Sequence, residues 1–193
     1  MLFAPSPDEM YPSGFCTWVV QQGLTGKLCG ASRPGHFKGV CTVVARLFNL
    51  TRPVLAVFGE KDFQQLRIIE RMVRDLAFPL KILRGPIIRE ADGLALSSRN
   101  RYLSASHRRQ AAKLFEAIQT AQRAFTQGET DPVRLCDTAV AVLDQAPDAR
   151  VEYVHLVDAH TLDPVTPATG LSRLLLAVRF GETRLIDNAA LTA

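Results

Sequence analysis

The chain has 193 residues, of which 47% are apolar and 22% charged, and this composition excludes a disordered or collagen-like protein. The formal net charge is +4, but Lys and Arg are scattered and do not alternate with aromatic residues, so we expect no nucleic-acid partner. No stretch of eighteen apolar residues and no signal peptide is visible, which predicts a cytoplasmic protein that does not bind membranes.

The first third of the chain gives weak signals for regular structure. Residues 2–4 form a short apolar segment, residues 17–20 are a strand candidate, and residues 30–37 are predicted to form a loop. The apolar positions between Val40 and Phe48 repeat at helical spacing, and Arg52-Pro53 ends that helix.

A βαβ unit follows. Residues 54–58 are short and wholly apolar, which predicts a buried parallel strand. Asp62 then begins a helix, and more buried strand is expected at residues 80–83 and 87–88. The apolar face of that helix is made by Leu66, Ile69, Met72, Val73 and Leu76.

The second half has a different order of predicted elements, with two successive helices followed by strands. One helix carries the apolar stripe from Leu114 to Phe125, and Asp131-Pro132 begins the next. The strand candidates are residues 151–157, 173–180 and 184–187, the last two joined at hairpin length. We therefore predict an α/β chain: part of a Rossmann-like parallel-sheet domain over residues 1–92 and a small α+β domain over residues 93–193.

Two segments point to phosphate binding. Residues 58–62 place a glycine and Lys61 between a strand and a helix start, as parallel α/β proteins do at phosphate sites. Residues 92–100 offer Ser97, Ser98 and Arg99 in a stretch without periodicity. Taken singly, Lys61 would be read as a solvated surface lysine, and Ser97-Ser98-Arg99 as a linker in which a serine caps a helix. The two segments together predict an ATP-dependent enzyme.

The cysteines and histidines predict no metal site. Cys16, Cys29, Cys41 and Cys136 contain no C-x-x-C pair, so we expect buried free thiols rather than zinc ligands or disulfides. We interpret His36 as structural and assign no function to the other histidines.

Several segments together closely resemble the pantothenate synthetase family, the pantoate and β-alanine ligases. The segments are residues 30–37 (GASRPGHF), 47–49 (LFN), 58–65 (FGEKDFQQ), 92–100 (DGLALSSRN) and 184–188 (RLIDN). The resemblance covers nearly the whole chain. It implies ATP with Mg²⁺, a pantoyl-adenylate intermediate, release of AMP and pyrophosphate, and a homodimer.

The resemblance also implies roles for individual residues. Lys61, Ser97, Ser98 and Arg99 match the catalytic residues that neutralise charge on the phosphates, and Gln65 matches a glutamine that binds pantoate. The matched nucleotide-binding positions are Gly59, Glu60, Lys61, Asp62, Ile88, Leu96, Ser97, Ser98 and Arg99.

One family feature is missing from this sequence. The resemblance implies an earlier segment with a His-x-Gly-His motif that binds the triphosphate, and the 193 residues contain none. Three interpretations stay open: an ordinary ligase given without its first part, one part of a split enzyme, or a non-catalytic nucleotide-binding remnant. A dinucleotide-binding oxidoreductase ranks below them because no G-x-G-x-x-G is present.

Overall fold

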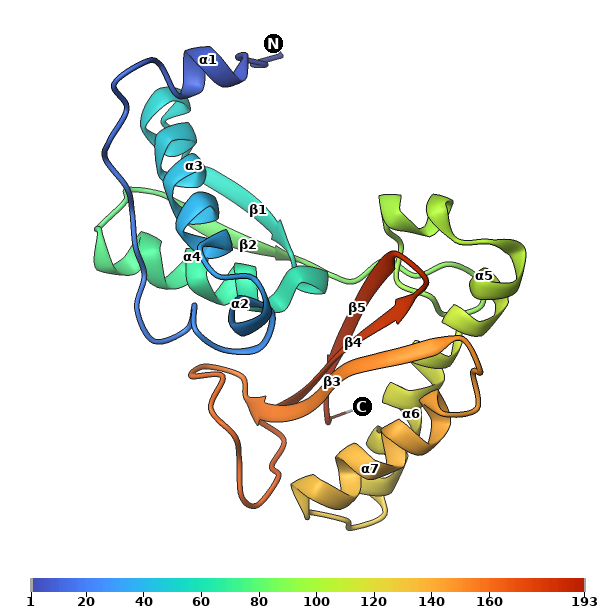
Figure 1. The fold of residues 1–193 in the computed structure, drawn as a ribbon. Coiled ribbons are helices and arrows are strands. Elements are labelled where there is room, and N and C mark those ends of the chain that lie inside the picture. Colours follow the sequence, from blue (N-terminus) through green and yellow to red (C-terminus); the bar gives the residue numbers. More distant parts are fainter. Residues whose placement is uncertain (1, 193) are drawn as a thin grey trace. The chain divides into compact units, whose positions relative to one another are not determined.

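The computed structural model describes residues 2–192, which form two compact units (Figure 1). The first unit takes the chain up to Phe58 together with Gln64–Gly85, and the second takes Gly59–Phe63 together with the chain from Pro86 onward. The short piece around Lys61 thus belongs with the C-terminal half. A functional division between residues 92 and 93 stays a prediction.

The first unit is built on a pair of strands, β1 (Leu55–Gly59) and β2 (Lys81–Gly85), connected through helix α4 (Phe63–Asp75). Figure 1 shows this arrangement, which confirms the strand, helix and strand predicted at residues 54–58, from residue 62 and at residues 80–83. The predicted βαβ unit is present only as its last part, a helix followed by β1. Helix α3 (His36–Thr51) packs against the pair through Phe48, whose ring meets Phe58 edge-on. The shorter helices are α1 (Pro7–Met10) and α2 (Leu28–Ser32).

Four local predictions in this unit are wrong. Residues 17–20 form no strand, since no neighbouring strand offers them hydrogen bonds; the Val19 amide donates to Thr42 Oγ1 on α3 instead. The expected loop at residues 30–37 contains the end of α2 and the start of α3. The strands β1 and β2 are not buried as predicted: Val54 is 83% exposed, Val57 65% and Leu83 48%. Leu76, predicted on the apolar face of α4, follows the end of that helix and is 54% exposed.

The second unit contains an antiparallel sheet in the order β3-β4-β5, formed by β3 (Ala149–Asp158), β4 (Ser172–Phe180) and β5 (Thr183–Ala190). Helices α6 (Lys113–Thr126) and α7 (Pro132–Leu143) supply apolar stripes that pack with this sheet. The largest fully buried side chains of this core are Leu94, Leu114, Ile118, Leu135, Leu143, Leu174, Leu176 and Phe180. Both helices and the β4–β5 hairpin were predicted, and the two sheets confirm the fold class.

Shorter elements of the second unit carry the candidate site. They are two 3-10 helices, η1 (Glu60–Asp62) and η2 (Ser98–Tyr102), and helix α5 (Ala105–Ala111). The predicted strand at residues 87–88 is absent, apart from a single bridge between Arg89 and Ala95.

The four cysteines are free, as predicted, but only Cys41 is buried and Cys16 is exposed. Within residues 2–192 no helix has both the length and the apolar character needed to cross a bilayer.

Candidate functional site

The first predicted phosphate segment forms the turn η1, directly after β1. Gly59 has a φ of −71°, and a Cβ built on it meets no atom within 4 Å, so neither backbone nor packing requires a glycine there. The Lys61 side chain is 18% exposed, and its ammonium group lies 3.9 Å from the Asp62 carboxylate. At that distance the ion pair is weak. The positive charge of Lys61 also acts on the Asp187 carboxyl, but no hydrogen bond engages the ammonium among the described residues, so its N–H groups can donate to a ligand.

The second predicted segment begins with a tight turn. The Leu96 amide donates to the Ile88 carbonyl at 2.8 Å, and Glu90 and Leu94 are bonded in the same way. Ile88 and Leu96 therefore lie side by side, both exposed. Gly93 at the tip has a φ of +88°, and a Cβ there would lie 2.0 Å from the Phe115 ring, so only glycine fits.

Ser97 and Ser98 lie at the start of η2, where Ser97 Oγ accepts a hydrogen bond from the Arg99 amide at 3.2 Å. The capping role considered for an isolated serine pair is thus real, and it leaves the Ser97 hydroxyl hydrogen free to donate elsewhere. Among the described residues, no ion pair or hydrogen bond engages the Arg99 guanidinium, which lies exposed. Arg99 is therefore a second available cation.

Arg99 borders a cavity of about 610 Å³ within the second unit. His107, Phe180 and Arg184 also line it, with Tyr102, Ser104 and residues 181–183. His107 Nε2 lies 3.7 Å from the Asp148 carboxylate, and Arg184 donates to Glu152. These two basic groups already have acidic partners, which leaves Arg99 as the cation here without one.

Strand β5 contacts both η1 and η2, so two segments more than thirty residues apart in sequence share one strand. The structure brings Lys61 and the Ser97–Arg99 residues into the same compact unit. No hydrogen bond or ion pair joins Lys61 to Ser97, Ser98 or Arg99 within residues 2–192. The shared strand supplies the connection between the two segments.

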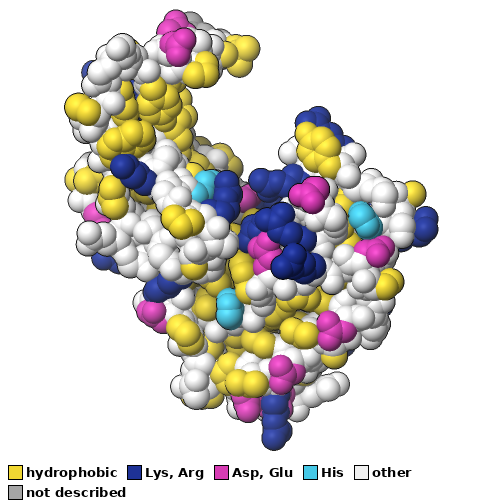
Figure 2. Space-filling view, viewed as in Figure 1, with side chains coloured by type: hydrophobic (Ala, Val, Ile, Leu, Met, Phe, Trp, Pro, Cys, Tyr) yellow, Lys and Arg dark blue, Asp and Glu magenta, His cyan; other side chains and the backbone are white. Residues whose placement is uncertain are grey.

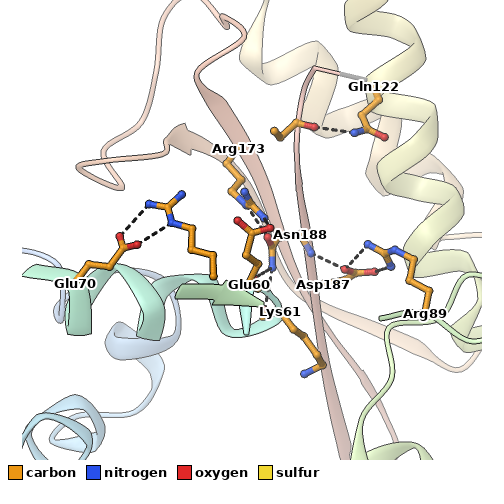
Figure 3. A network of polar contacts seen from close by, with 10 residues as sticks. Glu60, Lys61, Glu70, Arg89, Gln122, Arg173, Asp187 and Asn188 are labelled. Carbon is orange, nitrogen blue, oxygen red and sulfur yellow. Dashed lines mark hydrogen bonds and ion pairs between the residues drawn. The ribbon is translucent and has the colours of Figure 1, made fainter. Parts of the chain in front are cut away.

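A buried ion pair anchors this part of β5. Asp187 is 1% exposed and accepts two hydrogen bonds from Arg89, at 2.6 and 3.0 Å (Figure 3). Burial raises the pKa of the Asp187 carboxyl, while the Arg89 guanidinium opposes that rise. Arg89 also donates to the Gly93 carbonyl and lies over the Phe115 ring at 4.1 Å, so it connects β5 to the turn before Ser97.

Acidic side chains near the second segment are already paired. Arg108 donates to Glu90 at 2.7 Å and also to Asp92. These hydrogen bonds hold the pKa of both carboxyls below its usual range. No group of three or more potential ligands able to hold a metal ion exists in the part of the chain that the structure describes. In Figure 2, basic and acidic side chains lie interspersed on the face in view.

Gln65 lies half-buried in helix α4, in the first unit, so its grouping with Lys61 and Arg99 stays a prediction. Its neighbour Gln64 is buried and donates to the carbonyls of Leu24 and Lys27, which is a structural role. His36, the first residue of α3, lies 3.3 Å from Arg33 Nη1 and beside the Phe37 ring. The structural interpretation of His36 stays a prediction.

Sequence reasoning assigned no role to Asp187 and Asn188, nor to Arg173 on β4. Their side chains lie buried near η1, although η1 is far from them in sequence. The only signal was a pair of polar residues at the end of an apolar strand, in the segment 184–188 that supports the family resemblance.

Comparisons with known proteins agree on one family. A family model described as pantoate-beta-alanine ligase matches residues 1–190. The chain is 51% identical over 191 residues to pantothenate synthetase of Geobacter sulfurreducens, covering 99% of this chain and 68% of the relative. It is 48% identical over 190 residues to pantothenate synthetase of Pelotomaculum thermopropionicum, covering 98% of this chain and 67% of the relative.

Solved structures give the same result. The crystal structure of pantothenate synthetase from Thermus thermophilus matches with a TM-score of 0.95 at 46% identity, over 99% of this chain and 69% of that one. The crystal structure of pantoate-beta-alanine ligase from Francisella tularensis, complexed with beta-gamma ATP and beta-alanine, matches with a TM-score of 0.71 at 29% identity. This match covers 97% of this chain and 63% of that one. The chain thus spans about two thirds of the length of its relatives.

Proposed function

The chain belongs to the pantoate-beta-alanine ligase family, and from this membership we propose that it carries the phosphate-binding part of an enzyme that joins pantoate to β-alanine. The observation that supports the proposal most is the placing of two available cations, Lys61 and Arg99, on segments that share strand β5. ATP is the substrate whose charge these cations fit.

The reaction proceeds in two steps. A carboxylate oxygen of pantoate attacks the α-phosphorus of ATP, and the bond to pyrophosphate breaks, which gives pantoyl adenylate. The amine of β-alanine then attacks the activated carbonyl, loses a proton, and displaces AMP. Negative charge grows on phosphate oxygens during the first step, so fixed cations stabilise its transition state.

Lys61, Ser97, Ser98 and Arg99 are the proposed catalytic residues. The Lys61 ammonium and the Arg99 guanidinium neutralise phosphate oxygens, and the two serine hydroxyls donate hydrogen bonds to them. Gly59, Glu60, Asp62, Ile88 and Leu96 border the nucleotide. The open space at Gly59 and the exposed pair Ile88 and Leu96 suit that role. Gln65 hydrogen-bonds pantoate and orients it.

Magnesium accompanies ATP in this proposal. The carboxylates nearest the second segment, Glu90 and Asp92, are occupied by Arg108. The Asp62 and Glu60 carboxylates also have basic neighbours, Lys61 at 3.9 Å and Arg173 at 3.8 Å. Since the described residues contain no cluster of metal ligands, the site suits phosphate better than a metal ion held by the protein alone. Bound with ATP, Mg²⁺ would be held mainly by phosphate oxygens and would supply further charge neutralisation.

A second candidate is a fragment that is active only with a separate polypeptide. The exposed apolar side chains of β1 favour it, because a parallel sheet is normally covered on both faces. In both candidates the part of the relatives that this chain does not match supplies the His-x-Gly-His segment. We place the protein in the cytoplasm as a homodimer by extension from the family.

Isothermal titration of the 193-residue chain with MgATP tests the phosphate site. Lys61→Ala and Arg99→Ala are each expected to weaken binding at least tenfold, because each removes a charge-assisted contact. Lys113→Ala and Arg134→Ala are the matched controls, since both side chains form surface ion pairs in the same unit. Equal losses in all four variants would mean that binding depends on net charge alone and would refute the assignment.

A further inference from the structure

Asn188 forms the main polar contact between β5 and the turn that carries Lys61. Its side-chain Nδ2 donates to the carbonyls of Glu60 and Lys61, at 3.1 and 2.9 Å (Figure 3). Its Oδ1 accepts from Arg173 Nε at 2.6 Å, and the residue is 2% exposed. Both amide hydrogens and the amide oxygen therefore have partners.

The orientation of the Asn188 amide is determined by Arg173. The Nε–H of arginine can only donate, so the oxygen of Asn188 must face Arg173 and its nitrogen must face the turn. Arg173 is itself held in place, because its guanidinium lies 3.9 Å over the Phe63 ring and 3.8 Å from the Glu60 carboxylate. Both of these contacts are on or next to η1.

Positioning matters for Lys61 more than for a rigid side chain. A lysine reaches its target through a flexible four-carbon stem, so only its backbone can be fixed in advance. The turn η1 has three residues, and the hydrogen-bond geometry of a 3-10 helix is poorer than that of an α-helix. The two hydrogen bonds from Asn188 therefore add to the rigidity of this turn.

We propose that Asn188 is a positioning residue for the adenylating reaction: by binding the Glu60 and Lys61 carbonyls, it fixes the point from which the Lys61 side chain reaches the phosphates. The preceding residue, Asp187, holds the second segment through Arg89, which donates to the Gly93 carbonyl. Adjacent residues of one strand thus set both phosphate segments. This inference rests on the proposed role of Lys61.

Asn188→Asp is the sharpest test. The aspartate has the same shape and keeps an acceptor for Arg173, but it presents an oxygen instead of two N–H donors to the carbonyls. Gln122→Glu is the matched control: Gln122 Nε2 donates to the Ala190 carbonyl at 2.7 Å in the same unit, and it touches neither phosphate segment (Figure 3). Asn188→Ala removes the same donors without adding a charge and replaces the aspartate variant if that one does not fold.

Two readouts separate positioning from general stability. Amide hydrogen exchange of residues 60–63 is expected to rise at least tenfold in Asn188→Asp, with exchange in β3 and β4 changed less than twofold. The dissociation constant for MgATP is expected to rise at least tenfold, because two hydrogen bonds that hold the turn are lost. Gln122→Glu is expected to leave both values within twofold of the original chain.

The outcomes distinguish the two proposals. Unchanged exchange at residues 60–63, or faster exchange with unchanged MgATP affinity, would overturn the positioning role while leaving the phosphate site intact. Exchange that rises throughout the second unit would show a merely structural role. Absence of MgATP binding by the original chain would overturn the proposed function itself, and the positioning role with it.

Discussion

Gly93 is the residue whose replacement the structure predicts most sharply. It lies at the tip of the turn before Ser97 with a φ of +88°, a region that residues with a Cβ rarely adopt. A Cβ there would lie 2.0 Å from Phe115 Cδ1, well inside contact distance. Gly93→Ala must therefore strain the backbone and displace the Phe115 ring.

The two costs can be estimated separately. The left-handed backbone costs an alanine about 1–2 kcal/mol. Displacing a packed ring costs about 1–3 kcal/mol more, in the range measured for overpacked sites. We therefore expect Gly93→Ala to lower the free energy of unfolding by about 2–5 kcal/mol, and urea denaturation followed by circular dichroism measures it.

Gly128→Ala isolates the backbone cost. Gly128 has a φ of +101°, but a Cβ there meets no atom within 4 Å. This variant should lose only the first contribution, about 1–2 kcal/mol. In a Phe115→Ala background the cost of Gly93→Ala should fall to the same value. If Gly93→Ala is no more destabilising than Gly128→Ala, the clash with Phe115 does not exist and the reasoning fails.

Three further predictions concern the second unit. Arg89→Leu leaves the Asp187 carboxylate buried without its cation, so it should lower the free energy of unfolding by about 3–5 kcal/mol, measured by urea titration. Adding Asp187→Asn to this variant should recover part of the lost stability. Arg108 holds the pKa of Glu90 and Asp92 low, so their contribution to stability is complete above about pH 5 and is lost as pH falls through the lowered values. Unfolding measured from about pH 6 to pH 2 should therefore show a smaller loss of stability in Arg108→Gln, and an equal loss would contradict this. Asp131→Ala removes the cap on the Val133 amide and should cost about 1 kcal/mol by thermal unfolding, whereas Asp137→Ala, in the middle of the same helix, should change little.

Regular elements with strong apolar patterns could be predicted from sequence. The stripe of α4 and the short apolar run of β1 are local signals, and the structure places both where the pattern indicated. Residues 17–20 have equally good strand composition, but a strand also needs a neighbour for its hydrogen bonds, and composition does not supply one. The exposure of Val57 was missed for a related reason, since burial depends on elements that pack against the strand.

The site shows the same limit. Lys61 and Arg99 could be singled out because glycine, lysine and serine at those positions carry a local chemical meaning. Asn188 could not, because its role arises only when β5 is placed beside a turn more than 120 residues earlier in the chain. A polar pair ending an apolar strand is compatible with many environments, and only the fold shows which carbonyls it meets.

The central claim, that this chain carries the phosphate-binding part of a pantoate and β-alanine ligase, is tested most directly by AMP release. The chain would be fused behind the N-terminal third of the Geobacter sulfurreducens pantothenate synthetase and supplied with ATP, Mg²⁺, pantoate and β-alanine. We predict AMP release that requires pantoate and falls on the order of a hundredfold in Lys61→Ala. A folded fusion that releases no AMP, or one in which Lys61→Ala has no effect, would contradict the account.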